Sequence, residues 1–520
     1  MNARVVVIGA GIGGLTSAAL LAARGAEVTV CEKEAWVGGK ARRVVVDGAE
    51  IDGGPTVFTY RQVFDEVFAA CGARLEDHVS VNKAEVIARH AWDDGGHLDL
   101  YADRARSIDA VGAFAGAEAA RGYAGFTAEA QRIFEVLEEP FLRGDKASTP
   151  LPMMWRIGPS RIGDMLAMRP FDGMWKALGG HFRDARLQQL FGRYATYCGS
   201  SPFSAPATLM LIAHVEAQGV WLIEGGIHAL AKAIAALAQR QGARVRTGAA
   251  VAEVLTSGGR ASGVRLASGE VIPADIVICN GDPGALATGK LGEGAVRAVP
   301  PIQPAKRSLS ALVWYAHAET SGFGLTHHNV FFSRDYAREF REIGAGGTPS
   351  EPTVYVCAID RGAGEHAPPP QGSERIQIIV NAPANGDVHH YTPEERERCT
   401  RAMMATLTRC GLQLEQPFPH QLMTPQDWEG LFPATGGALY GRASHGWAAS
   451  FQRQGPKTRV PGLYCTGGAT HPAAGVPMAA LSGQLAARVI AKDLASMRTS
   501  RPVATPGGMS MPSATTGSTG

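Results

Sequence analysis

The sequence predicts an α/β protein in which a Rossmann-like, dinucleotide-binding domain is interrupted by an inserted α+β domain. An apolar, β-branched run at residues 5–8 breaks into glycines and continues as a helical pattern, and a second strand pattern follows at residues 27–31. Buried-strand patterns return much later, at residues 274–280 and 462–466. Strands that alternate with helices favour a parallel sheet, and the long intervening stretches favour a second domain inserted into the first.

In the first of these patterns, glycines fall where a dinucleotide-binding turn needs them. Gly9 permits a tight turn, Gly11 lets the backbone approach a pyrophosphate, and Gly14 lets the helix pack against the strand. Free N–H groups at the start of the helix would face phosphate oxygens. Glu32 follows the second strand, where an acidic side chain would accept hydrogen bonds from a ribose. The alternative is a strand, helix and strand whose glycines serve packing alone.

A second glycine-rich region follows this motif closely. Residues 38–41 read Gly-Gly-Lys-Ala, and residues 52–56 read Asp-Gly-Gly-Pro-Thr. Such glycines suggest backbone packed tightly along the same nucleotide, which favours FAD over NAD and a domain of the glutathione-reductase type. The alternative is a loop whose glycines serve turns only.

Composition excludes several classes of protein. The chain has 520 residues, too many for one compact core, and its 50 basic and 48 acidic residues leave no single-sign field for nucleic acid. Eight scattered cysteines without a CxxC pair indicate reduced thiols in a cytoplasmic protein. The histidine pairs at 327–328 and 389–390 lack further ligands at suitable spacing, so we expect no metal site.

Targeting signals are also not expected. The chain reaches its first strand too early for a signal peptide. No apolar run reaches the roughly 18 residues of a spanning helix, so membrane association would be peripheral. A stretch at 151–182 mixes methionine and tryptophan with arginine and lysine, which suits an apolar groove or an interfacial helix, with core packing as the alternative.

Changes in pattern divide the chain into alternating segments of two domains, followed by a tail. Residues 283–450 in particular predict an antiparallel sheet with helices on one side. The FAD-binding domain is expected at 1–85, 222–290 and 455–495, the substrate domain at 86–221 and 291–454, and a disordered tail at 496–520.

The closing segment predicts a second approach to the cofactor. A strand at residues 462–466 runs into Gly467 and Gly468, and a helix begins near Val476. A helix N-terminus aimed at N1 and O2 would stabilise the negative charge of reduced flavin. His471, in the loop between them, is either a catalytic base or a loop residue oriented by hydrogen bonds.

These motifs together resemble the FAD-dependent phytoene desaturase family of bacterial carotenoid enzymes, over residues 1 to about 494. Within that family, the stretch from Tyr194 to Ala213 and the run from Glu216 to Trp221 look closest to the hydroxyneurosporene (1-hydroxycarotenoid 3,4-) desaturases of purple bacteria. One departure is Ala473-Ala474, where relatives often carry glycine. The motifs that carry the resemblance are Gly9–Gly14 with Glu32, residues 38–41, residues 52–56, residues 194–202, Gly219–Trp221 with Glu224–Gly226, and residues 470–482.

The resemblance implies an FAD-dependent enzyme that introduces a C–C double bond into an acyclic carotenoid by hydride transfer to flavin N5. It implies a cytoplasmic protein bound peripherally to the inner, photosynthetic membrane, with oxygen or a quinone as electron acceptor. No catalytic side chain is identified, and Arg143, Asp145, Tyr197 and Glu216 are candidates for the substrate side. The expected cofactor-binding residues are Gly9, Gly11, Gly13, Gly14, Glu32, Lys33, Gly39, Lys40, Gly54, Pro55, Thr56, Val251, Gly467, Gly468, Val476, Pro477 and Met478.

Other functions on the same fold remain open at this point. A phytoene desaturase, or a carotenoid isomerase or saturase, would share these motifs. A flavin amine oxidase would instead need a small aromatic site for a cationic amine. A non-catalytic lipid carrier is the alternative from a different class, and the intact flavin-side loops at residues 53–55 and 470–478 argue against it.

Overall fold

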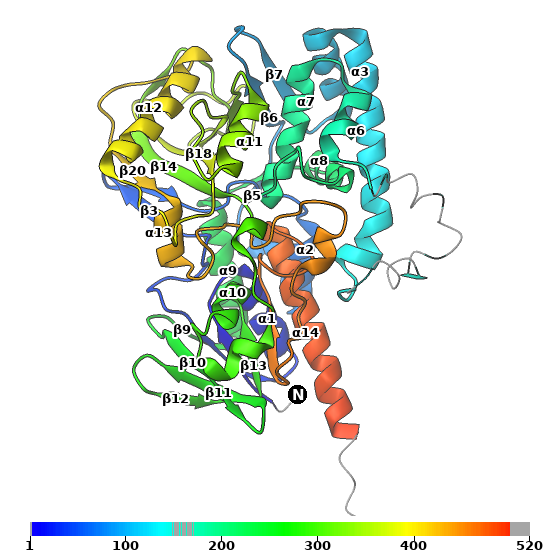
Figure 1. Ribbon diagram of the computed structural model, residues 1–520, viewed down its shortest axis with the longest axis vertical. Coiled ribbons are helices and arrows are strands. Elements are labelled where there is room, and N and C mark those ends of the chain that lie inside the picture. The colour runs from blue at the N-terminus through cyan, green and yellow to red at the C-terminus, as the bar shows by residue number, and fades with distance from the viewer. Residues whose placement is uncertain are drawn as a thin grey trace, which may run out of the picture.

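The computed structural model describes residues 3–147 and 171–499, together with residues 149, 155, 156, 158, 163 and 169. A five-stranded parallel sheet with its helices forms the lower half of the molecule in Figure 1, and a larger sheet with a helical layer beside it forms the upper half. Each half is built from several separate segments of the chain, because the chain passes between the two halves several times.

The parallel sheet has the strand order β21-β13-β1-β2-β9 and is assembled from distant parts of the chain. Val5 lies beside Val28 on one neighbouring strand and beside Ile276 on the other. Both faces are covered, which explains the continuous apolar run of the first strand. The strands are β1 (Arg4–Ile8), β2 (Glu27–Cys31), β9 (Arg244–Arg246), β13 (Ile276–Cys279) and β21 (Leu463–Cys465).

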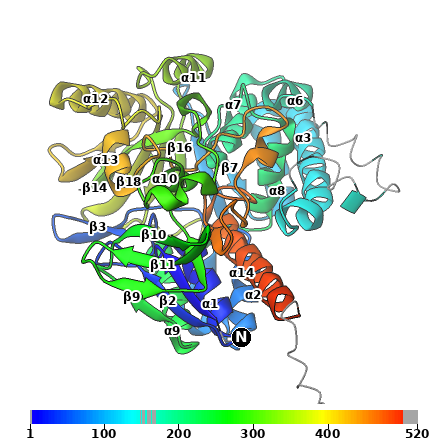
Figure 2. The same cartoon turned by 60° about the horizontal axis from the view of Figure 1, so that its bottom comes forward.

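Alternate residues of β1 face two different layers. Val5 and Val7 pack into a core shared with helices, whereas Val6 and Ile8 pack into a core shared with a three-stranded antiparallel sheet. Every residue of the first helix, α1, is buried, because α9 and α14 pack against it. Figure 2 shows these helices beside the first strands. The helices are α1 (Ile12–Ala22), α2 (Gln62–Ala70), α9 (Gly226–Arg240) and α14 (Val476–Thr499), and the antiparallel strands are β10 (Val251–Ser257), β11 (Arg260–Leu266) and β12 (Val271–Pro273).

The upper sheet has seven strands in the order β20-β14-β18-β17-β16-β6-β7. The antiparallel sheet expected for residues 283–450 is confirmed, because every strand pair from that stretch in this sheet is antiparallel. The one parallel junction is between β16 and β6, a strand from outside that stretch. That junction joins strands from the two separate segments of the chain. The strands are β6 (Val86–Ala91), β7 (His97–Tyr101), β14 (Ser310–Ala318), β16 (His328–Phe331), β17 (Val354–Ala358), β18 (Glu374–Ala382) and β20 (His420–Met423).

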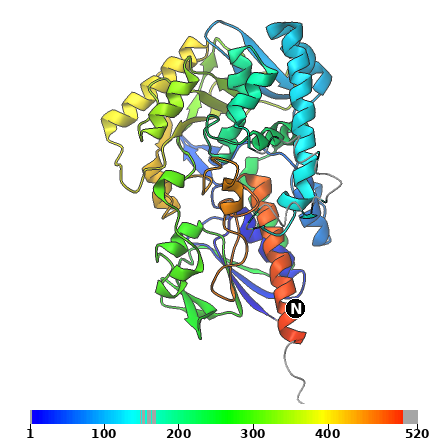
Figure 3. The same ribbon diagram turned by 45° about the vertical axis from the view of Figure 1, so that its right-hand side comes forward.

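A helical layer covers one side of this sheet, and α3 (Arg104–Leu137) runs along its outer edge (Figure 3). The helix is interrupted only at Gly116, whose φ of +88° suits glycine. The remaining α-helices, not all of which belong to this layer, are α6 (Met174–His181), α7 (Ala185–Gly192), α8 (Leu211–Ala217), α10 (Pro283–Ala287), α11 (Tyr336–Gly344), α12 (Pro393–Arg409) and α13 (Pro425–Leu431).

Short elements complete the described structure. The remaining strands are β3 (Arg43–Val46), β4 (Ala49–Asp52), β5 (Val81–Lys83), β8 (Trp221–Ile223), β15 (Thr320–Ser321) and β19 (Gln413–Leu414). The short helices are η1 (Leu75–Asp77), η2 (Glu138–Leu142), η4 (Arg193–Cys198), η5 (Ala207–Met210), η6 (Glu293–Ala298), η7 (Pro304–Lys306) and η8 (Ala449–Gln452).

The methionine-rich stretch at 151–182 lies largely outside the described residues. Of its described part, Met174 and Leu178 are core residues of the helical layer, whereas Trp155 and Phe171 have exposed fractions of 79% and 75%. Within the described ranges, no helix is long and apolar enough to cross a bilayer.

The predicted start of the tail at residue 496 is wrong, because α14 continues to Thr499. Alanine, leucine and lysine near its end all favour helix, which explains the extension. Residues 500–520 lie outside the described part of the chain.

Candidate functional site: a dinucleotide cradle and an adjoining pocket

The start of α1 forms the first wall of the predicted nucleotide site. Gly9 has a φ of +93°, which favours glycine, and Gly11 precedes the helix in an extended conformation. No side chain caps the first turn of α1, so its N–H groups are available to an anion. The strand, turn and helix predicted for this segment are therefore confirmed in shape.

Each glycine of the motif faces a close neighbour. A Cβ atom at Gly14 would lie 2.5 Å from the Gly9 carbonyl oxygen, and one at Gly13 would lie 2.8 Å from Cα of Gly467. A Cβ atom at Gly11 would lie 2.7 Å from Nδ2 of Asn280. Gly11 therefore has a packing role that was not predicted from the sequence. The one available signal was Asn280 itself, a polar residue directly after the buried strand at 276–279.

Glu32 lies at the end of β2, beside the glycine turn. Its buried carboxylate accepts hydrogen bonds from the N–H groups of Ala10, at 2.7 Å, and of Glu34, at 3.0 Å. Each carboxylate oxygen keeps a lone pair for a further donor, as a ribose hydroxyl requires.

Two further residues predicted to bind the cofactor lie on the edge of this region. The ammonium group of Lys33 lies 2.8 Å from the Glu34 carboxylate, and the Lys33 side chain is 42% exposed. Val251 begins β10, two residues after Ala249, whose N–H donates to the Glu32 carbonyl oxygen at 2.7 Å. Contact of either residue with the cofactor stays a prediction.

The second glycine-rich region packs against the first at backbone distance. A Cβ atom at Gly39 would lie 3.3 Å from Cα of Gly11, and one at Gly54 would lie 2.0 Å from the Lys40 carbonyl oxygen. The Lys40 ammonium group donates to the Leu439 carbonyl oxygen, and burial lowers the pKa of Lys40 to about 8. Pro55 and Thr56 follow at the surface of this loop, where both are partly exposed.

The C-terminal segment forms the opposite wall. Gly467 has a φ of +110°, and the space around a Cβ atom at Gly468 is open. Beyond them α14 begins with Val476, Pro477 and Met478, so that two helix starts meet at the ends of β1 and β21. This arrangement fits a dinucleotide lying across both helix starts.

His471 lies in the loop between β21 and α14, and it is 1% exposed. Its Nε2 atom lies 3.2 Å from the Gly144 carbonyl oxygen, to which an Nε2–H group would donate. Burial lowers the pKa of His471 to about 4, so the ring is neutral at physiological pH. These contacts favour the interpretation of His471 as a loop residue oriented by hydrogen bonds.

Two of the substrate-side candidates are held in ion pairs. The Arg143 guanidinium contacts the Glu66 carboxylate at 2.8 Å and the Glu138 carboxylate at 3.1 Å. Asp145 pairs with Arg488 of α14 at 3.0 Å. These contacts tie the segment after α3 to the first domain, which is a structural role for both residues.

Tyr197 and Glu216 come together in a buried cluster of the helical layer. The Glu216 carboxylate accepts hydrogen bonds from the hydroxyls of Tyr197, at 3.0 Å, and Tyr194. Burial raises the pKa of Glu216, and the nearby Arg193 guanidinium opposes that rise. Arg193 also donates to the Tyr197 hydroxyl at 3.0 Å. The four groups therefore interact with one another inside the domain, and Nε of Arg193 has no hydrogen-bond partner among the described residues.

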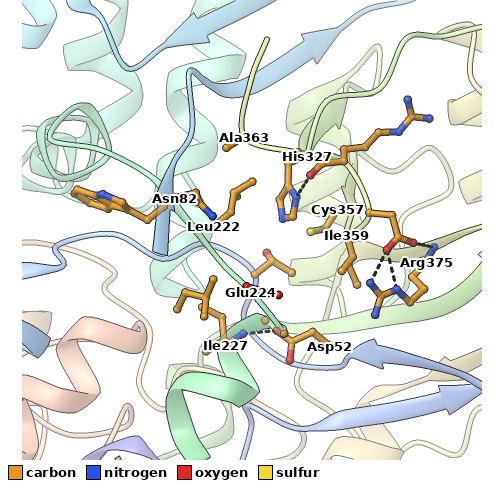
Figure 4. Close-up of a pocket in the computed structure, with 18 of the residues that line it drawn as sticks. Asp52, Asn82, Leu222, Glu224, Ile227, His327, Cys357, Ile359, Ala363 and Arg375 are labelled. Carbon is orange, nitrogen blue, oxygen red and sulfur yellow. Dashed lines mark hydrogen bonds and ion pairs between the residues drawn. The ribbon is translucent and has the colours of Figure 1, made fainter. Parts of the chain in front are cut away.

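A cavity of about 700 Å³ opens where the two domains meet (Figure 4). We call it the junction pocket, and its walls come from the loop after β4, from β8 with the start of α9, and from the strands and loops around β16, β17 and β18. The second-domain residues of this pocket were missed from sequence, because they share no local motif. Its lining includes Asp52, Thr56, Leu222, Glu224, Ile227, His327, Cys357, Ile359 and Arg375.

One group in the pocket wall bears on the expectation of no metal site. Donor atoms of His327, His328 and Cys357 lie within 4.8 Å of one another, because Cys357 stands opposite His328 in the β16–β17 pair. The two Nδ1 atoms are engaged, His327 with the Arg361 carbonyl oxygen and His328 with a tyrosine hydroxyl. A third potential ligand, Cys357, therefore comes from another strand than the two histidines. The expected absence of a metal site stays a prediction.

The parallel sheet, the two converging helix starts and the inserted domain define a two-domain, dinucleotide-dependent oxidoreductase. Residues 12–491 match the model of the flavin containing amine oxidoreductase family. The hydroxyneurosporene desaturase of Rubrivivax gelatinosus is 51% identical, over 99% of this chain and 98% of that protein. The hydroxyneurosporene desaturase of Cereibacter sphaeroides is 45% identical, over 95% and 98%.

The fold agrees with these matches. A crystal structure of an oxidoreductase from Methanosarcina mazei superposes with a TM-score of 0.60 at 16% identity, covering 94% of this chain and 100% of that one. The chain belongs to the flavin containing amine oxidoreductase family and, within it, to the carotenoid desaturases. It is an FAD-dependent oxidoreductase, as its motifs predict.

Proposed function

We propose that this enzyme introduces a C–C double bond at the 3,4 position of an acyclic 1-hydroxycarotenoid such as 1-hydroxyneurosporene. The observation that carries this proposal is the identity of 51% with a hydroxyneurosporene desaturase over almost the whole of both chains. The described cradle supports it, because two helix starts and a buried carboxylate are the groups that an FAD-binding site of this fold would use.

The reaction places few demands on side chains. When bound, FAD would supply the hydride acceptor for an allylic carbon, the conjugated chain of the substrate would spread the resulting positive charge, and loss of a proton from the neighbouring carbon would complete the double bond. The protein has to bind the polyene, orient one C–C bond and exclude water. Arg143, Asp145, Tyr197 and Glu216 all lie in ion pairs or hydrogen bonds with other side chains, which agrees with a protein that positions its substrate.

The test compares three substrates in liposomes. FAD-loaded protein is incubated separately with phytoene, neurosporene and 1-hydroxyneurosporene, and product absorption spectra are followed. A longer chromophore from the hydroxylated substrate alone is the expected result. Conversion of phytoene would instead identify an early desaturase, and unchanged spectra with all three would favour an isomerase or a carrier. Oxygen uptake, measured with and without added quinone, identifies the electron acceptor.

We also propose that the enzyme takes its substrate from a membrane surface. Phe171 and Trp447 are exposed by 75% and 49% and lie against each other, with ring centroids 5.6 Å apart. Trp155 is exposed by 79%. Exposed aromatic side chains of this kind favour a bilayer interface.

Vesicle co-sedimentation tests this surface. Serine at both Phe171 and Trp447 is expected to lower membrane binding at least tenfold, because each ring contributes roughly 1.5–3 kcal/mol when it leaves water. Val388→Ser is the control, since Val388 is exposed by 79% in the loop between β18 and α12. Equal binding by the double variant and the control would contradict the proposed surface.

A further inference from the structure

A hydrogen-bonded chain of three side chains connects the flavin-side loop at residues 53–56 to the upper sheet. The Thr56 hydroxyl lies 2.7 Å from the Tyr355 hydroxyl, which lies 2.7 Å from Nδ1 of His328. Thr56 belongs to the loop after β4, whereas Tyr355 and His328 belong to the neighbouring strands β17 and β16. His328 is 2% exposed, and its Nε2 atom has no hydrogen-bond partner among the described residues.

This chain can present two different faces to the junction pocket, because Thr56 lines that pocket. If Nδ1 of His328 accepts a hydrogen bond from the Tyr355 hydroxyl, the Tyr355 oxygen accepts one from the Thr56 hydroxyl, and Thr56 offers a lone pair to the pocket. If Nδ1 carries the hydrogen and donates instead, both hydrogen bonds reverse direction and Thr56 offers its hydroxyl hydrogen to the pocket. Burial keeps the pKa of His328 well below its usual value, so the ring stays neutral and both arrangements are available.

The proposed substrate carries a polar group close to the reacting bond. Its hydroxyl is bonded to C1, and a single carbon separates C1 from C3. When the 3,4 bond lies against the flavin, the hydroxyl therefore lies just beyond the ring. The junction pocket adjoins the flavin-side loop and offers Leu222, Ile227 and Ile359 for the methyl groups on C1 (Figure 4).

We propose that the junction pocket receives the hydroxylated end of the carotenoid, and that the Thr56 hydroxyl, held by Tyr355 and His328, forms the hydrogen bond that recognises it. This inference rests on the proposed function. A carotenoid without the hydroxyl would cover Thr56 and leave it short of a partner, which costs more free energy than the hydrogen bond itself contributes. Thr56 and Tyr355 are thus specificity-determining residues, and neither transfers a proton in the reaction.

The test measures binding rather than turnover. FAD-loaded protein is reduced with dithionite, which prevents hydride transfer, and quenching of tryptophan fluorescence gives Kd for neurosporene and for 1-hydroxyneurosporene. The Kd for neurosporene divided by the Kd for 1-hydroxyneurosporene gives a ratio that is compared between wild type, Tyr355→Phe and Thr56→Val. Flavin absorbance after gel filtration shows that each variant retains its cofactor.

Tyr336→Phe provides the matched control, because Tyr336 is also buried but its hydroxyl has no hydrogen-bond partner in the described structure. We expect the ratio to fall about tenfold in both test variants and to stay unchanged in Tyr336→Phe. In Tyr355→Phe the hydroxylated carotenoid binds more weakly, and in Thr56→Val neurosporene also binds more tightly because no hydroxyl is left without a partner. Ratios within twofold of wild type in both test variants would overturn the inference. If wild-type enzyme converts no hydroxylated carotenoid at all, the proposed function itself fails, which is a distinguishable result.

Discussion

Replacing Gly11 with alanine separates two reasons for that glycine. The new Cβ atom would lie 2.7 Å from Nδ2 of Asn280, against 3.4–4 Å for ordinary contact, so the amide has to move by about 0.7 Å. That amide donates to the Gly9 carbonyl oxygen at 3.2 Å, and the movement breaks this bond. A lost hydrogen bond of about 1 kcal/mol together with crowding gives a destabilisation of about 2 kcal/mol for the FAD-free protein.

Adding Asn280→Ala in the same chain removes the obstructing amide. We therefore expect urea unfolding to show that the double variant regains most of the stability that Gly11→Ala alone loses. FAD affinity, measured by quenching of flavin fluorescence, should stay at least tenfold weaker than in Asn280→Ala, because the Cβ atom still stands in the path of the pyrophosphate. A double variant that binds FAD as tightly as Asn280→Ala would refute the placement of the pyrophosphate at Gly11.

Two further predictions concern buried titratable groups. The native state holds His471 neutral down to about pH 4, whereas the unfolded chain protonates this ring below about 6.5, so wild type should lose about 3 kcal/mol of stability as pH falls through that window. His471→Gln should flatten this dependence in urea unfolding between pH 4.5 and 7, and an unchanged slope would contradict the burial. Glu216→Gln should cost about 3 kcal/mol by removing the negative charge near the buried Arg193 guanidinium, and Arg193→Met in the same chain should restore part of it, as thermal unfolding can measure. No recovery in that double variant would count against their electrostatic interaction.

Features with a local pattern were predictable from sequence. The glycine turn, the acidic residue after β2 and the strand that runs into Gly467 each depend on residues close together in the chain. Contacts between distant segments leave no such pattern. The packing of Asn280 on Gly11 and the bond from Tyr355 to Thr56 join residues that are hundreds of positions apart.

The ion pairs of Arg143 and Asp145 show the same limit. The family resemblance suggested a substrate contact for these charged residues, yet their partners are set by the fold and cannot be read from spacing. The parallel pairing of β16 with β6 was unpredictable for a related reason, since both strands are buried almost throughout and neither has a pattern that identifies its partner.

Backbone carbonyl groups fix the flavin-side loop against the upper sheet. The Gly53 carbonyl oxygen accepts a hydrogen bond from the Tyr315 hydroxyl at 2.7 Å, and the Gly54 carbonyl oxygen accepts one from Nε2 of Gln377 at 2.9 Å. Tyr315 lies on β14 and Gln377 on β18, so neighbouring strands of the second domain hold consecutive residues of the first. Because the acceptors are backbone atoms, substitutions within the loop leave them in place.

The same loop is anchored to the first domain by Asp52. Its buried carboxylate accepts hydrogen bonds from the N–H groups of Ile227, at 2.7 Å, and His228, at 3.2 Å, at the start of α9. One short segment therefore joins the helix of one domain to the sheet of the other, and it passes through the predicted flavin contact and one wall of the junction pocket. A shift of the upper sheet has to move this loop, so cofactor geometry and the shape of the pocket are coupled through the same few bonds.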